Sequence, residues 1–121
     1  MQPGILAVLR AKLNEARALL DEALDLSLAA RSTAFVTLYL AGYAQLAFAD
    51  GDPDRAALLE GAAEGLRRQV GLPAGPHLRR VEADLVARVQ GRLGGSRFNQ
   101  AFSAGSGLTQ REAVAIVQEH L

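Results

Sequence analysis

The stretch of this chain that most resembles a metal-binding sequence is residues 50–54, Asp-Gly-Asp-Pro-Asp. It matches the start of a calcium-binding loop, in which oxygen ligands alternate along the backbone. That loop requires Gly at its sixth position and Glu at its twelfth, and this chain has Arg55 and Gly61 there. Pro following Asp is instead typical of a helix start, so we predict a turn that opens a helix.

The other candidates for chemistry are two histidines, His77 and His120. One stands beside a Gly/Pro-rich segment and the other at the C-terminus, and neither belongs to an HExxH or ExxH pattern. The chain has no Cys, which excludes thiolate zinc sites, thiol nucleophiles and disulfides. Phosphate-binding glycine loops and nucleophile elbows are also missing. We therefore expect no catalysis, no metal and no cofactor.

Arginines form the third group, crowded into one stretch: Arg67, Arg68, Arg79, Arg80, Arg88, Arg92 and Arg97. Residues 1–66 carry 5 basic and 9 acidic groups, and residues 67–121 carry 8 and 4, so the net charge is zero. A nucleic-acid surface would need a more basic domain. Solvated helix faces with internal ion pairs are one interpretation, and a surface for an acidic protein partner is the other. The candidate surface comprises Arg67, Arg68, Arg79 and Arg80.

The elements that position these residues are helical throughout, because no segment alternates apolar and polar residues with a period of two. We expect helices over about 5–13, 14–30, 34–49, 53–70, 77–93, a short one from 96, and a last one from 110. Candidate caps are Asn14, Ser32 or Thr33, Ser96, and a capping box of Thr109 with Glu112. Residues 71–76 form the one clear linker, and Gly94 with Gly95 breaks the fifth helix.

The helix over 34–49 is the expected core element, and its small residues Ala41, Gly42 and Ala44 would let a neighbouring helix approach closely. The candidate pocket or core residues are its large side chains: Phe35, Tyr39, Tyr43 and Leu46. The segment falls short of the roughly 20 apolar residues that a membrane span needs. No signal peptide is visible, so a cytoplasmic location without membrane contact is expected.

A loose repeat organises the first half of the chain. Residues 14–24, NEARALLDEAL, recur as residues 54–64, DRAALLEGAAE, after about 40 residues. Such a period predicts stacked helical hairpins, somewhat longer than tetratricopeptide repeats. We therefore predict one all-α domain over residues 1–121. Residues 1–71 would form two tetratricopeptide-like hairpins, the first incomplete, and residues 77–121 a C-terminal helical cap.

Residues 47–64, AFADGDPDRAALLEGAAE, resemble the C-terminal helical tail of large actinobacterial regulators. Those proteins combine an ATP-binding module with tetratricopeptide-like repeats, and many end in a LuxR-type DNA-binding domain. The resemblance continues through Leu72-Pro73, residues 80–93, Gly94, Phe98, Phe102, Gly105, Leu108 and residues 112–114. Glu60 departs from it, since such tails more often have an apolar residue there. The ATP-binding and complete DNA-binding parts are absent from this sequence.

The resemblance implies a non-catalytic module for protein interaction or signal relay in a transcriptional regulator. The alternative is a small-molecule sensor with an apolar pocket beside the aromatic helix. The sequence leaves open whether the chain is a short protein or a fragment of a larger one. A homodimer through the apolar N-terminal helix is also expected, with a candidate surface of Ile5, Leu6, Leu9 and Leu13.

Overall fold

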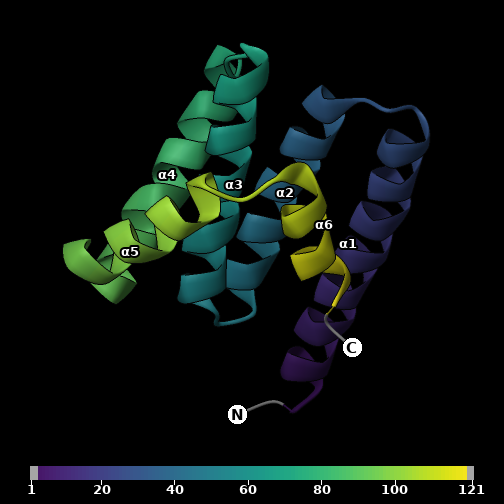
Figure 1. The fold of residues 1–121 in the computed structure, drawn as a ribbon. Coiled ribbons are helices and arrows are strands. Elements are labelled where there is room, and N and C mark those ends of the chain that lie inside the picture. Colours follow the sequence, from purple (N-terminus) through teal and green to yellow (C-terminus); the bar gives the residue numbers. More distant parts are fainter. Residues whose placement is uncertain (1–2, 120–121) are drawn as a thin grey trace.

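The computed structural model describes residues 3–119, and the side chains of residues 8–119. Within these residues the chain forms six α-helices and no strand (Figure 1), which confirms the all-α prediction. The helices are α1 Pro3–Ala29, α2 Thr33–Ala49, α3 Pro53–Val70, α4 Pro76–Leu93, α5 Gly95–Ser106 and α6 Gln110–Gln118.

The first helix differs from the prediction, because α1 runs without a break through Asn14. Asn14 is exposed inside this helix and caps nothing. An exposed Asn in a helix interior costs less than about 1 kcal/mol, so it cannot by itself end a helix whose neighbours continue to form backbone hydrogen bonds. Residues 3–13 therefore extend α1 and do not form a separate leading helix.

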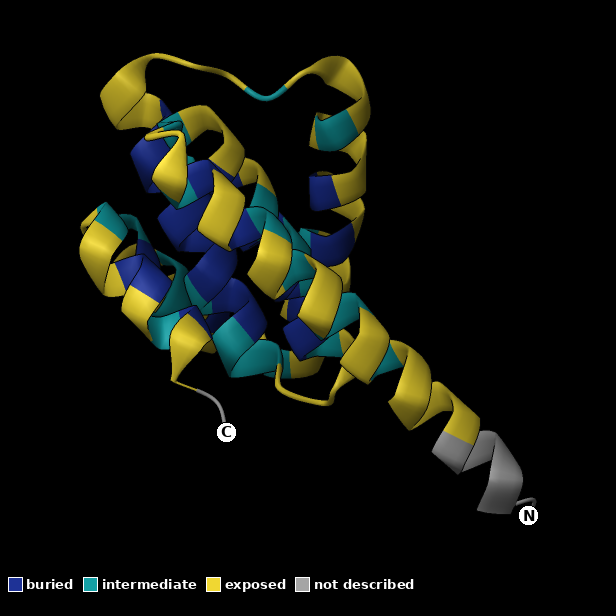
Figure 2. Cartoon of the chain, turned by 90° about the vertical axis from the view of Figure 1, so that its right-hand side faces the viewer, coloured by how far each residue is buried: buried dark blue, intermediate teal, exposed yellow. Residues whose placement is uncertain are grey.

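The centre of the molecule is α3, on which α2, α4 and α5 all pack, while α1 packs on the far side of α2. Figure 2 shows the buried residues concentrated on these inner helices, and the N-terminal part of α1 extending beyond the rest of the molecule. The core of α3 consists mainly of alanines and leucines, and Ala56, Leu59 and Ala63 are fully buried. Small side chains on α3 let several helices share it as a neighbour.

The closest helix crossing lies between α3 and α5, at three glycines. A Cβ atom on Gly61 would clash with the carbonyl oxygen of Phe102, one on Gly65 with that of Ser106, and one on Gly105 with that of Leu58. Backbone lies against backbone here, which only residues without a side chain permit. At the small residues predicted in α2 a neighbour also comes close, since Ala44 is fully buried and a Cβ on Gly42 would meet the side chain of Leu20, but the backbone crossing of α3 and α5 was not predicted.

The helix ends follow most of the local signals. The side chains of Ser32, Asp52 and Thr109 accept hydrogen bonds from backbone amides at the starts of α2, α3 and α6, and the predicted capping box of Thr109 with Glu112 is present. The prediction for Ser96 is wrong, because α5 already begins at Gly95 and has no side-chain cap.

The last helix returns to the first half of the chain. The hydroxyl of Thr33 donates to the Gln110 side chain over 3.0 Å, and the Arg55 guanidinium donates to the carbonyl of Ile116 over 2.6 Å. Cationic donors suit the C-terminal end of a helix, where carbonyl groups lack helical partners. These bonds hold α6 against α2 and α3.

Candidate functional site

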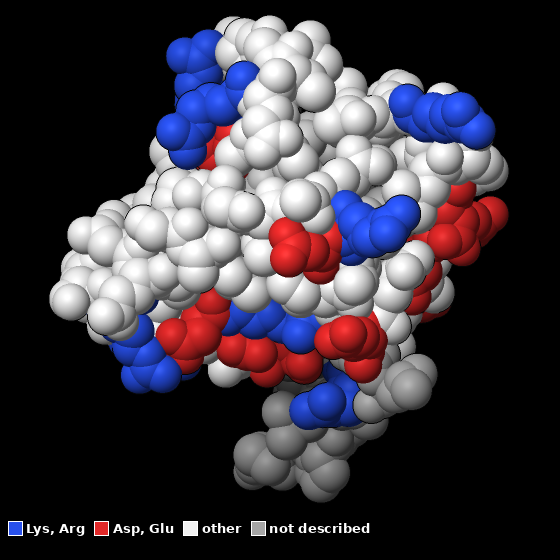
Figure 3. Space-filling view, viewed as in Figure 1, with Lys and Arg blue, Asp and Glu red and all other residues white. Residues whose placement is uncertain are grey.

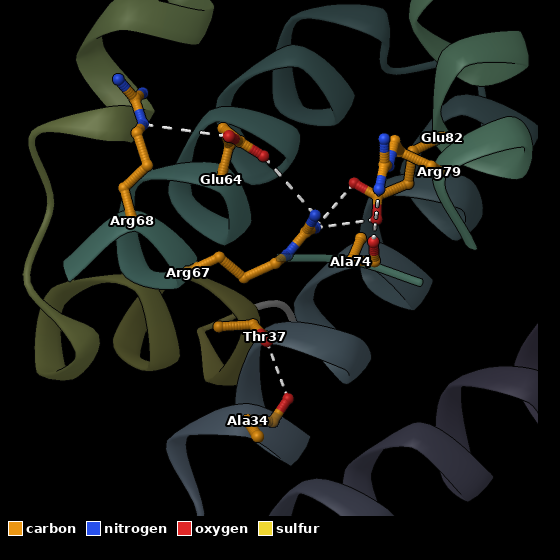
Figure 4. A network of polar contacts seen from close by, with 8 residues as sticks. All are labelled: Ala34, Thr37, Glu64, Arg67, Arg68, Ala74, Arg79 and Glu82. Atoms are coloured by element: carbon orange, nitrogen blue, oxygen red, sulfur yellow. Dashed lines mark hydrogen bonds and ion pairs between the residues drawn. The ribbon is translucent and has the colours of Figure 1, made fainter. Parts of the chain in front are cut away.

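A buried ion pair joins α3 to α4. One guanidinium nitrogen of Arg67, Nη2, lies 2.8 and 2.7 Å from the two carboxylate oxygens of Glu82, and its Nη1 lies 3.5 Å from Glu64 (Figure 4). Arg67 is 7% exposed and Glu82 is 8% exposed. Arg67 is therefore not part of the accessible surface, which corrects the sequence analysis. Removing either partner would leave a buried charge without its counter-charge, which costs several kcal/mol.

A second buried carboxyl, Glu60, lies behind this pair and is 2% exposed. Burial first, and then a hydrogen bond with Glu82, raise the pKa of Glu60 to about 9. Glu60 is thus a neutral acid at pH 7 and does not contribute to balancing the charge of Arg67. Perturbed carboxyl groups often mark active sites, but Glu60 does not line any of the three cavities described for this structure.

Next to the ion pair, a cavity of about 370 Å³ opens where α3 ends. Gly71 ends α3 in the left-handed conformation, with φ of 67°, and turns the chain away toward α4. The connection 71–75 forms one wall of the cavity. The lining residues are Glu64, Arg67, Arg68, Gly71, Leu72, Pro73, Ala74 and Arg79.

Two exposed arginines border this cavity. Arg68 lies 3.9 Å from Glu64, and Arg79 donates to the Ala74 carbonyl over 3.4 Å, so both guanidinium groups are only weakly engaged. Arg80 follows on the exposed surface but does not line the cavity. Figure 3 shows basic side chains gathered at the end of the molecule where α3 meets α4.

Charge at this cavity is unevenly balanced. Three arginines, Arg67, Arg68 and Arg79, line the cavity with one acidic residue, Glu64, while Glu82 pairs with Arg67 from outside the lining and the nearby Glu60 is protonated. The surrounding surface also exposes Leu72 and Val70, at 47% and 45%. Arginine and apolar side chains together are characteristic of protein interfaces. The arrangement can bind a carboxylate group whose neighbouring atoms are apolar.

The four large residues of α2 do not gather around one pocket. Tyr43 and Leu46 are buried, Tyr39 is half-buried, and Phe35 is 53% exposed, so Phe35 lies outside the core and the prediction is corrected there. The cavity beside Tyr43 and Leu46 has only about 130 Å³. Burial, with a 2.5 Å hydrogen bond from its hydroxyl to Asp21, raises the pKa of Tyr43 and keeps it protonated.

The predicted N-terminal surface is only partly described. The side chains of Ile5 and Leu6 lie outside the described residues. Leu9 is 53% exposed, and Leu13 is half-buried on the side of α1 that faces the molecule. The two described members of this predicted surface, Leu9 and Leu13, thus do not share one exposed face of α1.

The remaining candidates for chemistry do not converge. His77 is exposed on the first turn of α4, and His120 lies outside the described residues. Of the aspartates in residues 50–54, Asp52 caps α3, and Asp50 and Asp54 pair with arginines, as in the bidentate contact of Asp54 with Arg97. Among the described residues, no three His, Asp or Glu side chains are placed to hold a metal ion, and none of the helices is long and apolar enough to cross a membrane.

Sequence reasoning missed the buried carboxyl groups Glu60 and Glu82. In α4 the apolar Val81 is 38% exposed, whereas its charged neighbour Glu82 is buried, so residue type alone does not indicate the buried side. One signal was available, since Glu60 interrupts the Ala/Leu pattern of residues 56–63 on an otherwise apolar face. No family model matches the chain, and no curated protein or solved structure matches it.

Proposed function

We propose that this chain is a non-catalytic interaction module that holds an acidic segment of a partner protein against the arginine-lined cavity at the end of α3. In this proposal α1 to α3 act as tetratricopeptide-like hairpins that support the site. The resemblance to the helical tails of bacterial regulators supports a role in relaying a signal within such a regulator in the cytoplasm. The single observation that carries the proposal is the pair of weakly engaged arginines, Arg68 and Arg79, on one cavity.

The buried ion pair explains how such a site could be stable. Glu82 fixes Arg67 in the wall of the cavity, and this ion pair holds the end of α3 beside the start of α4. Arg68 and Arg79 then stand on two different helices at the cavity, and separate carboxylates of an acidic partner segment would engage them. Charge-assisted bonds of this kind are stronger than bonds between neutral groups.

The sensor alternative has less support. Its pocket was expected beside the aromatic residues of α2, where the structure has a cavity of about 130 Å³ that is also lined by Arg17, Asp50, Asp52 and Arg55. Pockets for small organic ligands usually have about 300–1,000 Å³. A cavity this small and polar favours the interaction module.

A titration with a fluorescein-labelled hexaglutamate peptide, followed by anisotropy, tests the proposal. The parent chain should bind in a salt-dependent manner, and the variant Arg68→Glu/Arg79→Glu should bind at least about tenfold more weakly. The control Arg31→Glu/Arg88→Glu changes the net charge equally at exposed arginines away from the cavity and should bind like the parent. A parent that fails to bind, or equal losses in both double variants, would overturn the proposed site.

A further inference from the structure

The side of α1 that faces away from α2 exposes large apolar residues. Val8, Leu19 and Leu26 are 55%, 67% and 66% exposed. The opposite side of the helix packs on α2, with Leu24 and Ser27 buried. Leucines that are two-thirds exposed and seven residues apart form one stripe along a helix, because seven residues complete almost two turns.

The stripe extends over most of α1. Its members follow one another in alternating steps of four and three residues, and all are exposed: Val8, Lys12, Glu15, Leu19, Glu22 and Leu26. This is the spacing of a coiled-coil seam. Alanines flank it, with Ala11 and Ala18 on one side and Ala16 and Ala23 on the other. Small flanking residues let a second helix come close.

We propose that the outward stripe of α1 binds the same stripe of a second copy of this chain, antiparallel, with the two-fold axis level with residue 17. In that register Val8 faces Leu26 of the partner subunit, Lys12 faces Glu22 of the partner subunit, and Glu15 faces Leu19 of the partner subunit. Each pair occurs twice, since a two-fold interface is self-complementary.

The charged residues of the stripe favour an antiparallel over a parallel pair of helices. A parallel pair in register would place Lys12 against Lys12 of the partner subunit, and likewise Glu22 against Glu22 of the partner subunit, and like charges at a seam are destabilising. In the antiparallel pair each lysine meets a glutamate.

Basic and acidic residues are also divided between the two halves of α1 as a whole. Residues 8–17 carry three basic groups and one acidic group, whereas residues 18–29 carry three acidic groups and no basic group. Figure 3 shows the acidic side chains along the side of the molecule that α1 forms. In the antiparallel pair the basic residues 8–17 of one copy would lie along the acidic residues 18–29 of the other. This interface does not involve the arginine-lined cavity and stands independently of the proposed function.

Sedimentation equilibrium measures the association. One helix pair is a small interface, so dimerisation in the micromolar range is expected. The variant Leu19→Lys/Leu26→Lys should raise the dimer Kd at least about a hundredfold, since four leucines lose burial. The control Phe35→Lys changes a 53% exposed aromatic residue of α2 and should leave Kd unchanged. A parent that remains monomeric at several hundred micromolar, or a Kd indifferent to Leu19→Lys/Leu26→Lys, overturns the proposal.

Cross-linking tests the direction, because the chain has no Cys of its own. Val8 and Leu26 are about 27 Å apart along one helix. The double variant Val8→Cys/Leu26→Cys should therefore form disulfide-linked dimers, while each single variant should not. Efficient linking of both single variants would show a parallel pair and overturn the antiparallel arrangement.

Discussion

Glu60 is the residue with the largest effect on how stability depends on pH. Its pKa is about 9 in the folded chain and 4.5 for an ordinary Glu, so between these values the folded state binds one more proton than the unfolded state. Stability then falls as pH rises, by up to about 1.4 kcal/mol per pH unit. The contribution is fully favourable below pH 4.5 and is lost progressively toward pH 9.

The variant Glu60→Gln should remove this dependence, because an amide does not ionise and can still donate a hydrogen bond to Glu82. Urea unfolding should show similar stability for parent and variant near pH 5. At pH 8 the variant should be more stable, by on the order of 3 kcal/mol. Glu64→Gln, four residues further along α3 at a half-exposed site, serves as the control and should leave the pH dependence in place. If the free energy of unfolding changed with pH in the same way for the parent and for Glu60→Gln, a protonated Glu60 would be contradicted.

At the scale of the helices, the crossing of α3 and α5 is the contact least able to adjust. A Cβ on Gly61 meets backbone, the carbonyl of Phe102, whereas one on Gly42 meets only the end of the Leu20 side chain, 2.8 Å away. Both glycines lie inside helices, where Ala is favoured over Gly by about 1 kcal/mol. Replacing each glycine by Ala therefore distinguishes the effect of helix propensity from that of helix packing.

Gly61→Ala should therefore destabilise the chain by about 1–3 kcal/mol, since α5 must move away from α3. Gly42→Ala should be neutral or slightly stabilising, because Leu20 can change rotamer. Thermal unfolding followed by circular dichroism measures both. Equal midpoints for the two variants would show that α5 is not held as closely as described.

Local signals explain which helix boundaries could be predicted. The starts of α2, α3 and α6 depend on a cap residue and its next few neighbours, and these were predicted correctly. Asn14 has the same side chain as a cap, and only the continuing hydrogen bonds of α1 distinguish it from one. Local sequence contains no information on that choice.

The site was less predictable, because its key residues depend on partners distant in the sequence. The counter-charge of the buried Arg67 comes mainly from Glu82, on the next helix. Its neighbour Arg68 has the same chemistry and lies in solvent. The glycine crossing had a visible signal, since Gly61 and Gly65 stand four residues apart in an Ala-rich helix. That spacing is typical of close helix contacts, but the sequence does not say which helix makes the contact.

At the scale of the whole molecule, the last three helices return to the first three. Against α3, α4 contributes the ion pair of Glu82 with Arg67, and α5 contributes the glycine crossing. The third, α6, is bonded to Thr33 and Arg55. Cooperative unfolding is expected when the core residues of each helix are buried by helices that are distant in the sequence. The full chain should therefore unfold in one transition, seen alike by circular dichroism and by tyrosine fluorescence.

A truncated chain that ends at residue 75 should fail to fold. It keeps the α2–α3 hairpin, but it exposes the α3 surface that α4 and α5 cover and leaves Arg67 without Glu82. Each large apolar side chain of α3 that α4 and α5 no longer cover costs about 1.5–3 kcal/mol, which is a large fraction of the stability of a small domain. A chain that ends at residue 107 loses only α6 and should remain folded with a lower melting temperature. A cooperative melt from the shorter fragment would show that residues 1–71 fold as independent hairpins, and α4 to α6 would then be an appended cap.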